Sequence, residues 1–370
     1  MFKKAGILVL LVVLLASFAT MSCKKKDDDG AATGKGTPYI AVVSKGEQHD
    51  FWQQVKLGAN AAADKYGVDI TFEGPPSESD VQVQVEMLNN AMAKGPVAIA
   101  LAALDTNSVI DQLQECKDKG IPVIGFDSGV PNAPAGSIYA NASTDNFNAA
   151  GMAAIAMFDV IKGDIEKASS AKPVTIVVMN QDAAGESLLS RGKGFRDTMV
   201  DLIVSKTALT EGDIKVMGNP AYVESKNPTK GNKVMIEMVV PASAAATDSA
   251  AAATAVLNKV KEANILGIFC SNEATVKGLL AATNDGSDLT AAYPGLVVLG
   301  FDAGEGQKNA VRSEYFLGSI TQDPYSIGYK AVELAFNAYS GKSVSDVDTG
   351  AKFYNKDNMD DADIKGLLYD

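Results

Sequence analysis

Two seven-residue stretches constrain the fold of this chain most strongly: Ile121–Asp127 (IPVIGFD) and Leu296–Asp302 (LVVLGFD). Each is a continuous apolar run that ends in Gly-Phe-Asp. Such a run without alternation is typical of a parallel strand covered by helices on both faces. The terminal Asp then emerges at the carboxyl edge of its sheet, where open parallel sheets bind ligands. The repeat predicts two similar α/β lobes that each direct one carboxylate into a shared cleft.

The length and composition agree with two lobes. A chain of 370 residues exceeds the usual size of a single core, and 46% hydrophobic residues supply enough apolar material for two. The formal net charge of -12 argues against a nucleic-acid partner, because a phosphate-binding surface needs an excess of Lys and Arg.

The N-terminus has the pattern of an export signal. Lys3 and Lys4 precede the apolar run from Ile7 to Leu15, and small residues follow. This pattern is typical of a secretory signal peptide, and the run is too short and wrongly flanked for a retained membrane span. We therefore expect residues 1–22 to be a signal peptide.

The segment Phe18–Cys23 resembles a bacterial lipobox, in which signal peptidase II cleaves before a cysteine that carries the lipid. Thr20, Met21 and Ser22 depart from the usual Leu-Ala-Gly. The alternative is an ordinary secretory peptide with an incidental cysteine. Residues 23–36 are polar and small, which is typical of a flexible tether. The resemblance implies a lipid on Cys23 and a protein anchored to a bacterial membrane on its extracytoplasmic side.

Strands and helices are expected to alternate along the rest of the chain. The first series has strands at 39–44, 68–72, 97–101 and 121–127 and helices at 51–66, 80–94 and 107–119. The second has helices at 146–162, 188–204, 248–263, 273–282 and 325–339 and strands at 174–179, 265–270, 296–302, 316–322 and 352–354. This alternation with short loops predicts doubly wound parallel sheets.

Residues 208–232 interrupt the second series. Short strands are expected at 214–217 and 234–240 around a polar, Pro-bearing excursion, which we interpret as an inserted hairpin or lid. For the helix after it, Asp248 or Ser249 is the expected N-cap.

The order of elements places three crossings between the lobes, near 142–145, 321–323 and 352–355. The N-terminal lobe is then expected to comprise 37–144 with 323–352, and the C-terminal lobe 145–322 with 353–370. Several crossings of this kind act as hinges about which two lobes close.

Seven short motifs occur in an order that carries a family resemblance. They are His49–Trp52, Ile121–Asp127, Ser143–Asn146, Ser190–Phe195, Cys270–Glu273, Gly300–Asp302 and Thr321–Gln322. In this order the chain resembles the type I periplasmic sugar-binding proteins of ABC importers, the ribose-binding protein group in particular. The resemblance covers nearly everything after the tether. It implies the type I periplasmic-binding-protein fold of the periplasmic binding protein and lac repressor superfamily.

The resemblance also implies a set of ligand-binding residues. They are His49, Phe51, Trp52, Asp127, Ser128, Arg191, Asn272, Asp302 and Gln322. The chemistry suits a sugar, because aromatic rings cover its C–H faces while planar polar groups bond the rim of hydroxyls.

Each of these residues also has a structural alternative. The two aromatic residues could pack into the core, and an Asp at a strand end is often a helix cap. Arg191 could lie on the surface, paired with Glu186 or Asp197. For Asn272 the alternative is a turn residue or N-cap, for Gln322 a hinge residue, and for His49 an exposed loop position.

Two departures from the family pattern bear on the ligand. Ser128 stands where the ribose group has an Arg after the binding Asp, which argues against ribose itself. Ala244–Thr247 lies where relatives carry another aromatic wall, so Tyr222 from the inserted segment is the candidate cover for that face of the sugar.

An enzyme is the first rival class, and its machinery is missing from the sequence. With His49 as the one histidine, no Ser/His/Asp arrangement can be built without it. Cys116 and Cys270 sit in apolar contexts and are expected to be buried free thiols, one on a helix and one in a strand. We expect no enzymatic activity, no cofactor and no metal.

A regulator of the lac repressor class shares the fold but begins with a DNA-binding helix-turn-helix, where this chain has the export pattern. The remaining alternative is a sensor subunit that presents a bound nucleoside or signalling molecule to a membrane receptor. The sequence favours a lipid-anchored, monomeric substrate-binding component of an ABC importer. Its expected ligand is a neutral monosaccharide or related polyol, and its expected partners are the permease and ATPase subunits.

Overall fold

The computed structural model describes residues 36–47, 49–223 and 230–369. The predicted signal peptide, Cys23 and the predicted tether up to residue 35 lie outside the described residues. Within the described part of the chain, no helix is both long enough and apolar enough to cross a membrane.

The first of two sheets has the strand order β12-β5-β4-β3-β1-β2, and all of its pairs are parallel. Its strands are β1 (Tyr39–Val43), β2 (Asp69–Glu73), β3 (Ala98–Leu101), β4 (Val123–Phe126), β5 (Ile138–Ser143) and β12 (Val347–Asp348). All residues of β3 and β4 are buried, as expected for continuous apolar runs in the middle of a parallel sheet.

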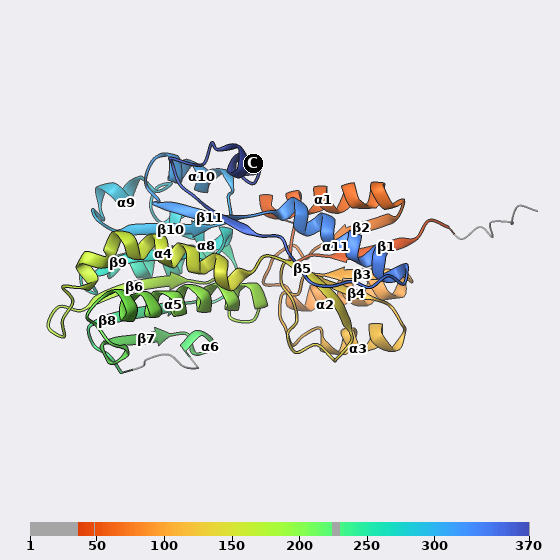
Figure 1. The fold of residues 1–370 in the computed structure, drawn as a ribbon, viewed down its shortest axis with the longest axis horizontal. Helices are drawn as coiled ribbons and strands as arrows, with labels where there is room; N and C mark the ends of the chain where they lie inside the picture. Colours follow the sequence, from red (N-terminus) through yellow and green to blue (C-terminus); the bar gives the residue numbers. More distant parts are fainter. Residues whose placement is uncertain (1–35, 48, 224–229, 370) are drawn as a thin grey trace, which may run out of the picture. The chain divides into compact units, whose positions relative to one another are not determined.

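Helices cover both faces of this sheet (Figure 1). One face carries α1 (Asp50–Tyr66) and α11 (Pro324–Tyr339), and the other carries α2 (Val81–Ala93) and α3 (Ile110–Asp118). The apolar side chains under each pair form separate core clusters. We call this sheet with its four helices the first lobe.

The second sheet has the order β13-β11-β10-β9-β6-β8-β7, with β13 antiparallel to β11 and the other pairs parallel. Its strands are β6 (Val174–Met179), β7 (Ile214–Gly218), β8 (Val234–Val239), β9 (Ile265–Cys270), β10 (Val297–Phe301), β11 (Gly318–Gln322) and β13 (Ala351–Tyr354). The predicted fold class, two doubly wound α/β lobes, is confirmed.

The second sheet is also covered by helices on both faces (Figure 1). They are α4 (Asn146–Ile165) and α5 (Glu186–Lys206) on one face and α7 (Ala246–Asn258), α8 (Glu273–Ala281) and α10 (Glu305–Arg312) on the other. Short elements complete it: η1 (Glu211–Asp213), α6 (Pro220–Val223), α9 (Ser287–Ala291) and α12 (Ala362–Lys365). We call this sheet with its helices the second lobe.

The two sheets repeat one order of strands, since β4 and β10 occupy equivalent places and β7 is an additional edge strand. The repeated Gly of the two Gly-Phe-Asp motifs has a steric reason in both. A Cβ on Gly125 would lie 2.0 Å from Asn141 Oδ1, and one on Gly300 would lie 2.5 Å from Gln307 Nε2. Close packing at these two points therefore favours glycine.

Of the two interpretations of 208–232, an inserted hairpin or a lid, the hairpin is wrong for the described residues. β7 and β8 pair in parallel, whereas the strands of a hairpin pair antiparallel. Between them the described residues hold the short helix α6 and no further strand. Among the described residues, the segment adds one edge strand, β7, to the second sheet.

The predicted N-cap of α7 is also wrong. Ala245 caps the helix, while Asp248 lies in its first turn and accepts a hydrogen bond from the hydroxyl of Ser243 at 2.7 Å. The hydroxyl of Ser249 donates a hydrogen bond to the carbonyl of Ala274 on α8. One of these contacts is local and the other joins two helices, and the cap pattern reveals neither.

The two cysteines of the described chain are free and buried, one on α3 and one on β9, as predicted. Burial raises the pKa of the Cys116 thiol to about 11 and also raises that of Cys270. Both thiols therefore stay protonated near neutral pH and are poor nucleophiles.

Candidate functional site

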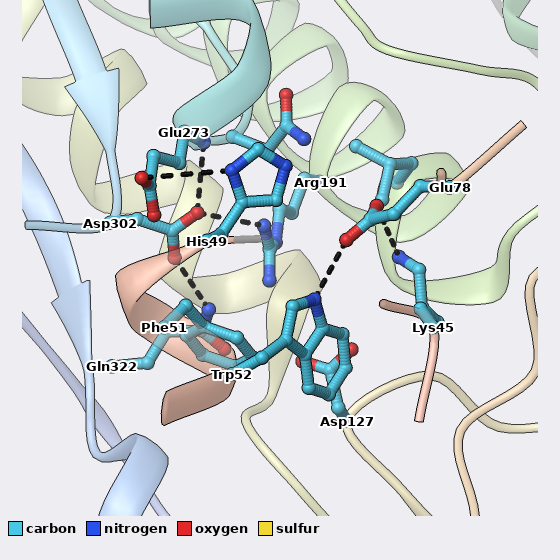
Figure 2. A pocket seen from close by; sticks show the side chains of 12 residues that line it. Lys45, His49, Phe51, Trp52, Glu78, Asp127, Arg191, Glu273, Asp302 and Gln322 are labelled. Atoms are coloured by element: carbon cyan, nitrogen blue, oxygen red, sulfur yellow. Dashed lines mark hydrogen bonds and ion pairs between the residues drawn. The ribbon is translucent and has the colours of Figure 1, made fainter. Parts of the chain in front are cut away.

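One pocket lies at the carboxyl ends of the central strands of both sheets (Figure 2). It contains about 330 Å³ of space not occupied by protein atoms, its open mouth included. Its lining consists of Lys45, His49, Phe51, Trp52, Glu78, Asp127, Leu188, Arg191, Asn272, Glu273, Asp302 and Gln322. Eight of the nine predicted ligand-binding residues are therefore brought together from both lobes.

Asp127 and Asp302 have equivalent backbone geometry. Both residues have left-handed backbone, with φ values of 54° and 80°. The amide of Asp127 donates to the carbonyl of Ala142 on β5 at 3.0 Å, and that of Asp302 donates to Ile320 on β11 at 2.6 Å. Asp tolerates this conformation better than most residues do. The turn directs each carboxylate from the end of its strand into the pocket.

The two carboxylates differ in their partners. Asp302 accepts hydrogen bonds from Gln322 Nε2 at 2.7 Å and from the amide of Glu273 at 2.9 Å, with Arg191 Nη1 at 3.9 Å. Within the described residues, nothing donates a hydrogen bond to the side chain of Asp127. Its carboxylate is therefore an acceptor in the pocket that remains open to a ligand.

Burial raises the pKa of Asp127 to about 6, against the attraction of Lys45 and Arg191. Burial likewise raises the pKa of Asp302, although Arg191 and the hydrogen bond from Gln322 oppose the shift. Both groups are nearly inaccessible to water, with 3% and 5% of their surface exposed. A ligand that donates hydrogen bonds would stabilise their charged forms.

Arg191 is a buried residue of α5 and not a surface residue paired with Glu186 or Asp197. Its Nε donates to Asn146 Oδ1 at 2.8 Å and its Nη1 to the carbonyl of Ser271 at 3.2 Å. The guanidinium lies 3.8 Å from the centre of the Phe301 ring. These contacts fix the plane of the guanidinium at the edge of the pocket.

Phe51 and Trp52 contribute both to the pocket and to the core. Their rings meet edge to face at a centroid distance of 5.0 Å, and Trp52 also meets Phe126 edge to face at 6.3 Å. Only 6% and 2% of their surfaces are exposed. The core alternative and the pocket prediction thus describe the same two side chains.

His49 precedes α1 and is not an exposed loop residue. Its Nδ1 lies 3.7 Å from Glu273 Oε1 on α8, and 19% of its side chain is exposed. Burial alone would lower the pKa of His49, but Glu273 and Glu78 together raise it above the usual 6.5. The contact joins the two lobes across the pocket (Figure 2).

Asn272 is the N-cap of α8, because its Oδ1 accepts the amide of Thr275 at 3.1 Å. It also lines the pocket, and its Nδ2 donates to Gln181 Oε1 at 2.5 Å. Gln322 donates to Asp302, while its Oε1 is buried and has no hydrogen-bond partner among the described residues. That oxygen is a second acceptor available to a ligand.

Two residues singled out from the sequence do not line the pocket. Ser128 is fully buried, and its hydroxyl oxygen accepts the amide of Ser187 at 3.4 Å. Tyr222 is also fully buried, packs in the core of the second lobe and donates to the carbonyl of Asp182 at 2.6 Å. Tyr222 therefore does not cover a face of the pocket.

Lys45, Glu78, Leu188 and Glu273 line the pocket but were not predicted. Lys45 follows β1 at the same carboxyl edge that identified Asp127, so this rule could have found it. Glu273 belongs to the motif Cys270–Glu273 from which only Asn272 was chosen. Glu78 and Leu188 carry no comparable signal, because loop conformation and helix rotation decide where they point.

Comparison with known proteins identifies the family. A model described as a periplasmic binding protein domain matches residues 40–343, most of the chain. The chain belongs to this family. The family consists of binding proteins, so the predicted family and the prediction of a non-enzymatic protein are both confirmed.

Several members of known name are similar along most of their length. The D-allose-binding periplasmic protein of Escherichia coli (strain K12) is 23% identical over 320 residues, which cover 86% of this chain and 90% of the relative. The structure of an ABC transporter, LacI family transcriptional regulator from Brachyspira murdochii is 38% identical, with a TM-score of 0.74 over 90% of this chain and 99% of that one.

A third similar protein was solved with a ligand. It is an ABC transporter solute-binding protein from Agrobacterium vitis with bound D-fucose. It is 28% identical, with a TM-score of 0.69 over 90% of this chain and 100% of that one. The similarity to these structures spans both lobes of the periplasmic binding protein.

Proposed function

We propose that this protein is the extracytoplasmic substrate-binding component of an ABC importer and captures one monosaccharide or related polyol between its lobes. The observation that carries the proposal is the opposed pair of carboxylates, Asp127 and Asp302, together with Arg191 in one pocket. The names of the similar proteins support the same class of ligand, since they include a D-allose-binding protein and a D-fucose complex.

The proposed contacts follow from the chemistry of the lining. Asp127 and Gln322 Oε1 accept from sugar hydroxyls, and Lys45, Arg191 and Asn272 donate to them. Phe51 and Trp52 cover an apolar face of the ring. Because the lining contains both acidic and basic side chains, a neutral ligand rich in hydroxyls satisfies more of them than an anion or a cation does.

Closure of the lobes is the proposed mechanism of capture. In the structure the lobes touch beside the pocket through His49 and Glu273, and the amide of Thr106 donates to the carbonyl of Ala184 at 3.3 Å. Among the described residues, the chain passes three times between the two sheets, and these three connecting segments form the hinge. A ligand that contacts both lobes favours the closed form, which the permease then recognises.

A thermal-shift screen tests the proposal. The purified mature protein is melted with D-allose, D-fucose, D-ribose, polyols, nucleosides and amino acids. A sugar or polyol is expected to raise the melting temperature by binding the folded state alone. If only nucleosides or amino acids raise it, the monosaccharide assignment falls while the family remains.

We also propose that Cys23 carries a lipid that anchors the protein to the bacterial membrane on its extracytoplasmic side. The support is the resemblance of Phe18–Cys23 to a lipobox and the polar segment that follows. Labelling with radioactive palmitate in the expressing bacterium is expected to mark the wild type and not Cys23→Ser. No label in the wild type, or the same label in the variant, rejects the anchor.

A further inference from the structure

Glu78 lies between β2 and α2 and makes three polar contacts around the pocket. Figure 2 shows those with Trp52 and Lys45. Glu78 Oε1 accepts Trp52 Nε1 at 2.7 Å, and Glu78 Oε2 accepts Gln181 Nε2 at 2.7 Å. The ammonium of Lys45 lies 3.8 Å from Oε2. Trp52 and Lys45 belong to the first lobe, whereas Gln181 follows β6 of the second.

Gln181 links Glu78 to Asn272 through two hydrogen bonds. A carboxylate only accepts, so Gln181 must present its NH₂ group to Glu78 and keeps its oxygen free for a donor. Asn272 Nδ2 is that donor, at 2.5 Å, which leaves Asn272 Oδ1 to cap α8 through the amide of Thr275. The orientation of two amides thus depends on one carboxylate of the opposite lobe.

Glu78 keeps the required charge over the whole physiological range. Burial alone would raise its pKa, but Lys45, His49 and the hydrogen bonds from Gln181 and Trp52 lower it to about 2. Only 8% of its side chain is exposed, so these contacts are little screened by water. The side chain of Glu78 is therefore an ionised acceptor at every physiological pH.

We propose that Glu78 is a positioning residue that holds Lys45 and Trp52 in its own lobe and, through Gln181, orients Asn272 in the other. The relay Glu78–Gln181–Asn272 forms when the lobes meet, so it couples closure to the arrangement of the pocket. This inference rests on the proposed capture of a ligand between the lobes.

The relay is separable from the core. Trp52 is also packed by Phe51 and Phe126, and Glu78 and Gln181 lie on loops at the ends of strands. Glu78→Gln and Gln181→Ala are therefore expected to fold. Glu73→Gln is a matched control, because Glu73 ends β2 in the same lobe, pairs with Lys94 and does not line the pocket.

The first arm of the test needs no sugar. Trp52 is the one tryptophan of the sequence, so its fluorescence reports the indole that Glu78 holds. In the ligand-free protein, Glu78→Gln is expected to shift the Trp52 emission maximum, and Glu73→Gln to leave it unchanged. An unshifted spectrum in Glu78→Gln, or an equal shift in both variants, overturns the positioning role.

The second arm measures coupling between the lobes by titration calorimetry with D-allose, D-fucose and D-ribose. For a sugar that binds the wild type, Glu78→Gln and Gln181→Ala are each expected to weaken binding about tenfold or more. The double variant is expected to lose no more affinity than the single variant that binds the sugar less tightly. Losses that multiply in the double variant overturn the relay.

The two arms separate the inference from the proposed function. If none of the three sugars binds the wild type, the fluorescence arm alone decides on Glu78, and the monosaccharide assignment is decided by the wider thermal-shift screen. If a sugar binds and the losses multiply, the assignment stands and the relay falls.

Discussion

His49 Nδ1 and Glu273 Oε1 lie 3.7 Å apart and join the start of α1 in one lobe to the start of α8 in the other. Burial opposes the charge on His49, but Glu273 and Glu78 prevail and raise the pKa of His49. Lys277 acts in the opposite sense, and it also pairs with Glu273. Asp50 lies close by, since it and Glu273 both approach Gly304. The contact is therefore strongest when His49 is protonated.

This relationship predicts a pH-dependent stability. Because the folded pKa of His49 lies above the ordinary 6.5, its contribution is fully present below pH 6.5 and is lost as the pH rises through the folded pKa. At pH 5.5 the free energy of unfolding of the wild type is expected to exceed that of His49→Gln by about 1 kcal/mol. The difference should shrink toward pH 8.5 in urea unfolding of the ligand-free protein. A difference that grows with pH contradicts the assignment.

Asp127 also predicts that the stability of the ligand-free protein falls as the pH rises, in this case because an unfavourable buried charge develops. Its pKa is raised from 3.8 to about 6 by burial, so the folded state holds a proton that the unfolded state has already lost. This cost is absent below pH 3.8, develops up to about pH 6 and remains above it. At 1.36 kcal/mol per pKa unit, it amounts to roughly 3 kcal/mol at pH 7.

Asp127→Asn is therefore expected to stabilise the ligand-free protein at pH 7 by about 1–3 kcal/mol and to leave it nearly unchanged at pH 3.5. The same variant should weaken sugar binding, because an amide donates where the carboxylate accepted. Matched melting curves at the two pH values check the first expectation. Destabilisation at pH 7 would show that Asp127 has protein partners in solution.

Asp302 is expected to behave differently from its counterpart. Asp302→Ala removes the acceptor of Gln322 and of the Glu273 amide and leaves Arg191 without its buried carboxylate. We expect a loss of about 2–4 kcal/mol of stability together with weaker sugar binding.

Asp127→Ala is the matched comparison for Asp302→Ala. It should weaken binding without destabilising the ligand-free protein at pH 7, since no described residue hydrogen-bonds its side chain. Urea unfolding and calorimetry on both variants check this asymmetry. Equal losses of stability in the two variants would contradict it.

Much of this site could be predicted from the ends of strands. Asp127 and Asp302 terminate apolar runs, and the carboxyl edge of a parallel sheet is a property of topology that such runs reveal. The doubly wound parallel sheets followed from the alternation of elements, and the similarity of the two lobes from the repeated motif. These features depend on local sequence and on few long-range choices.

Other features depended on contacts that no local pattern encodes. Glu78 and Gln181 meet from two loops of different lobes, and their pairing follows from how the lobes pack against each other. The parallel pairing of β7 with β8 is likewise a long-range choice at a sheet edge, so the hairpin interpretation failed there. Ser128 follows Asp127 directly but faces Ser187, because the left-handed turn at Asp127 separates the two side chains.

Two glycines lie where α1 and α11 contact each other. A Cβ on Gly58 of α1 would lie 1.9 Å from the carbonyl oxygen of Tyr325, and one on Gly328 of α11 would lie 1.9 Å from that of Val55. The two backbones thus touch through glycines on both helices. Since backbone cannot yield as a flexible side chain does, Gly58→Ala or Gly328→Ala is expected to cost about 3 kcal/mol or more.

Gly163 on α4 is the control, because a Cβ there meets nothing within 4 Å. Gly163→Ala should stabilise the protein by about 0.5–1 kcal/mol through helix propensity alone. The clash has a further consequence, since α1 begins beside His49 with Phe51 and Trp52, and α11 follows Gln322. Gly58→Ala should therefore also weaken sugar binding from outside the pocket, whereas Gly163→Ala should not. Unfolding and calorimetry that find Gly58→Ala as stable as wild type would show that the helices separate at little cost.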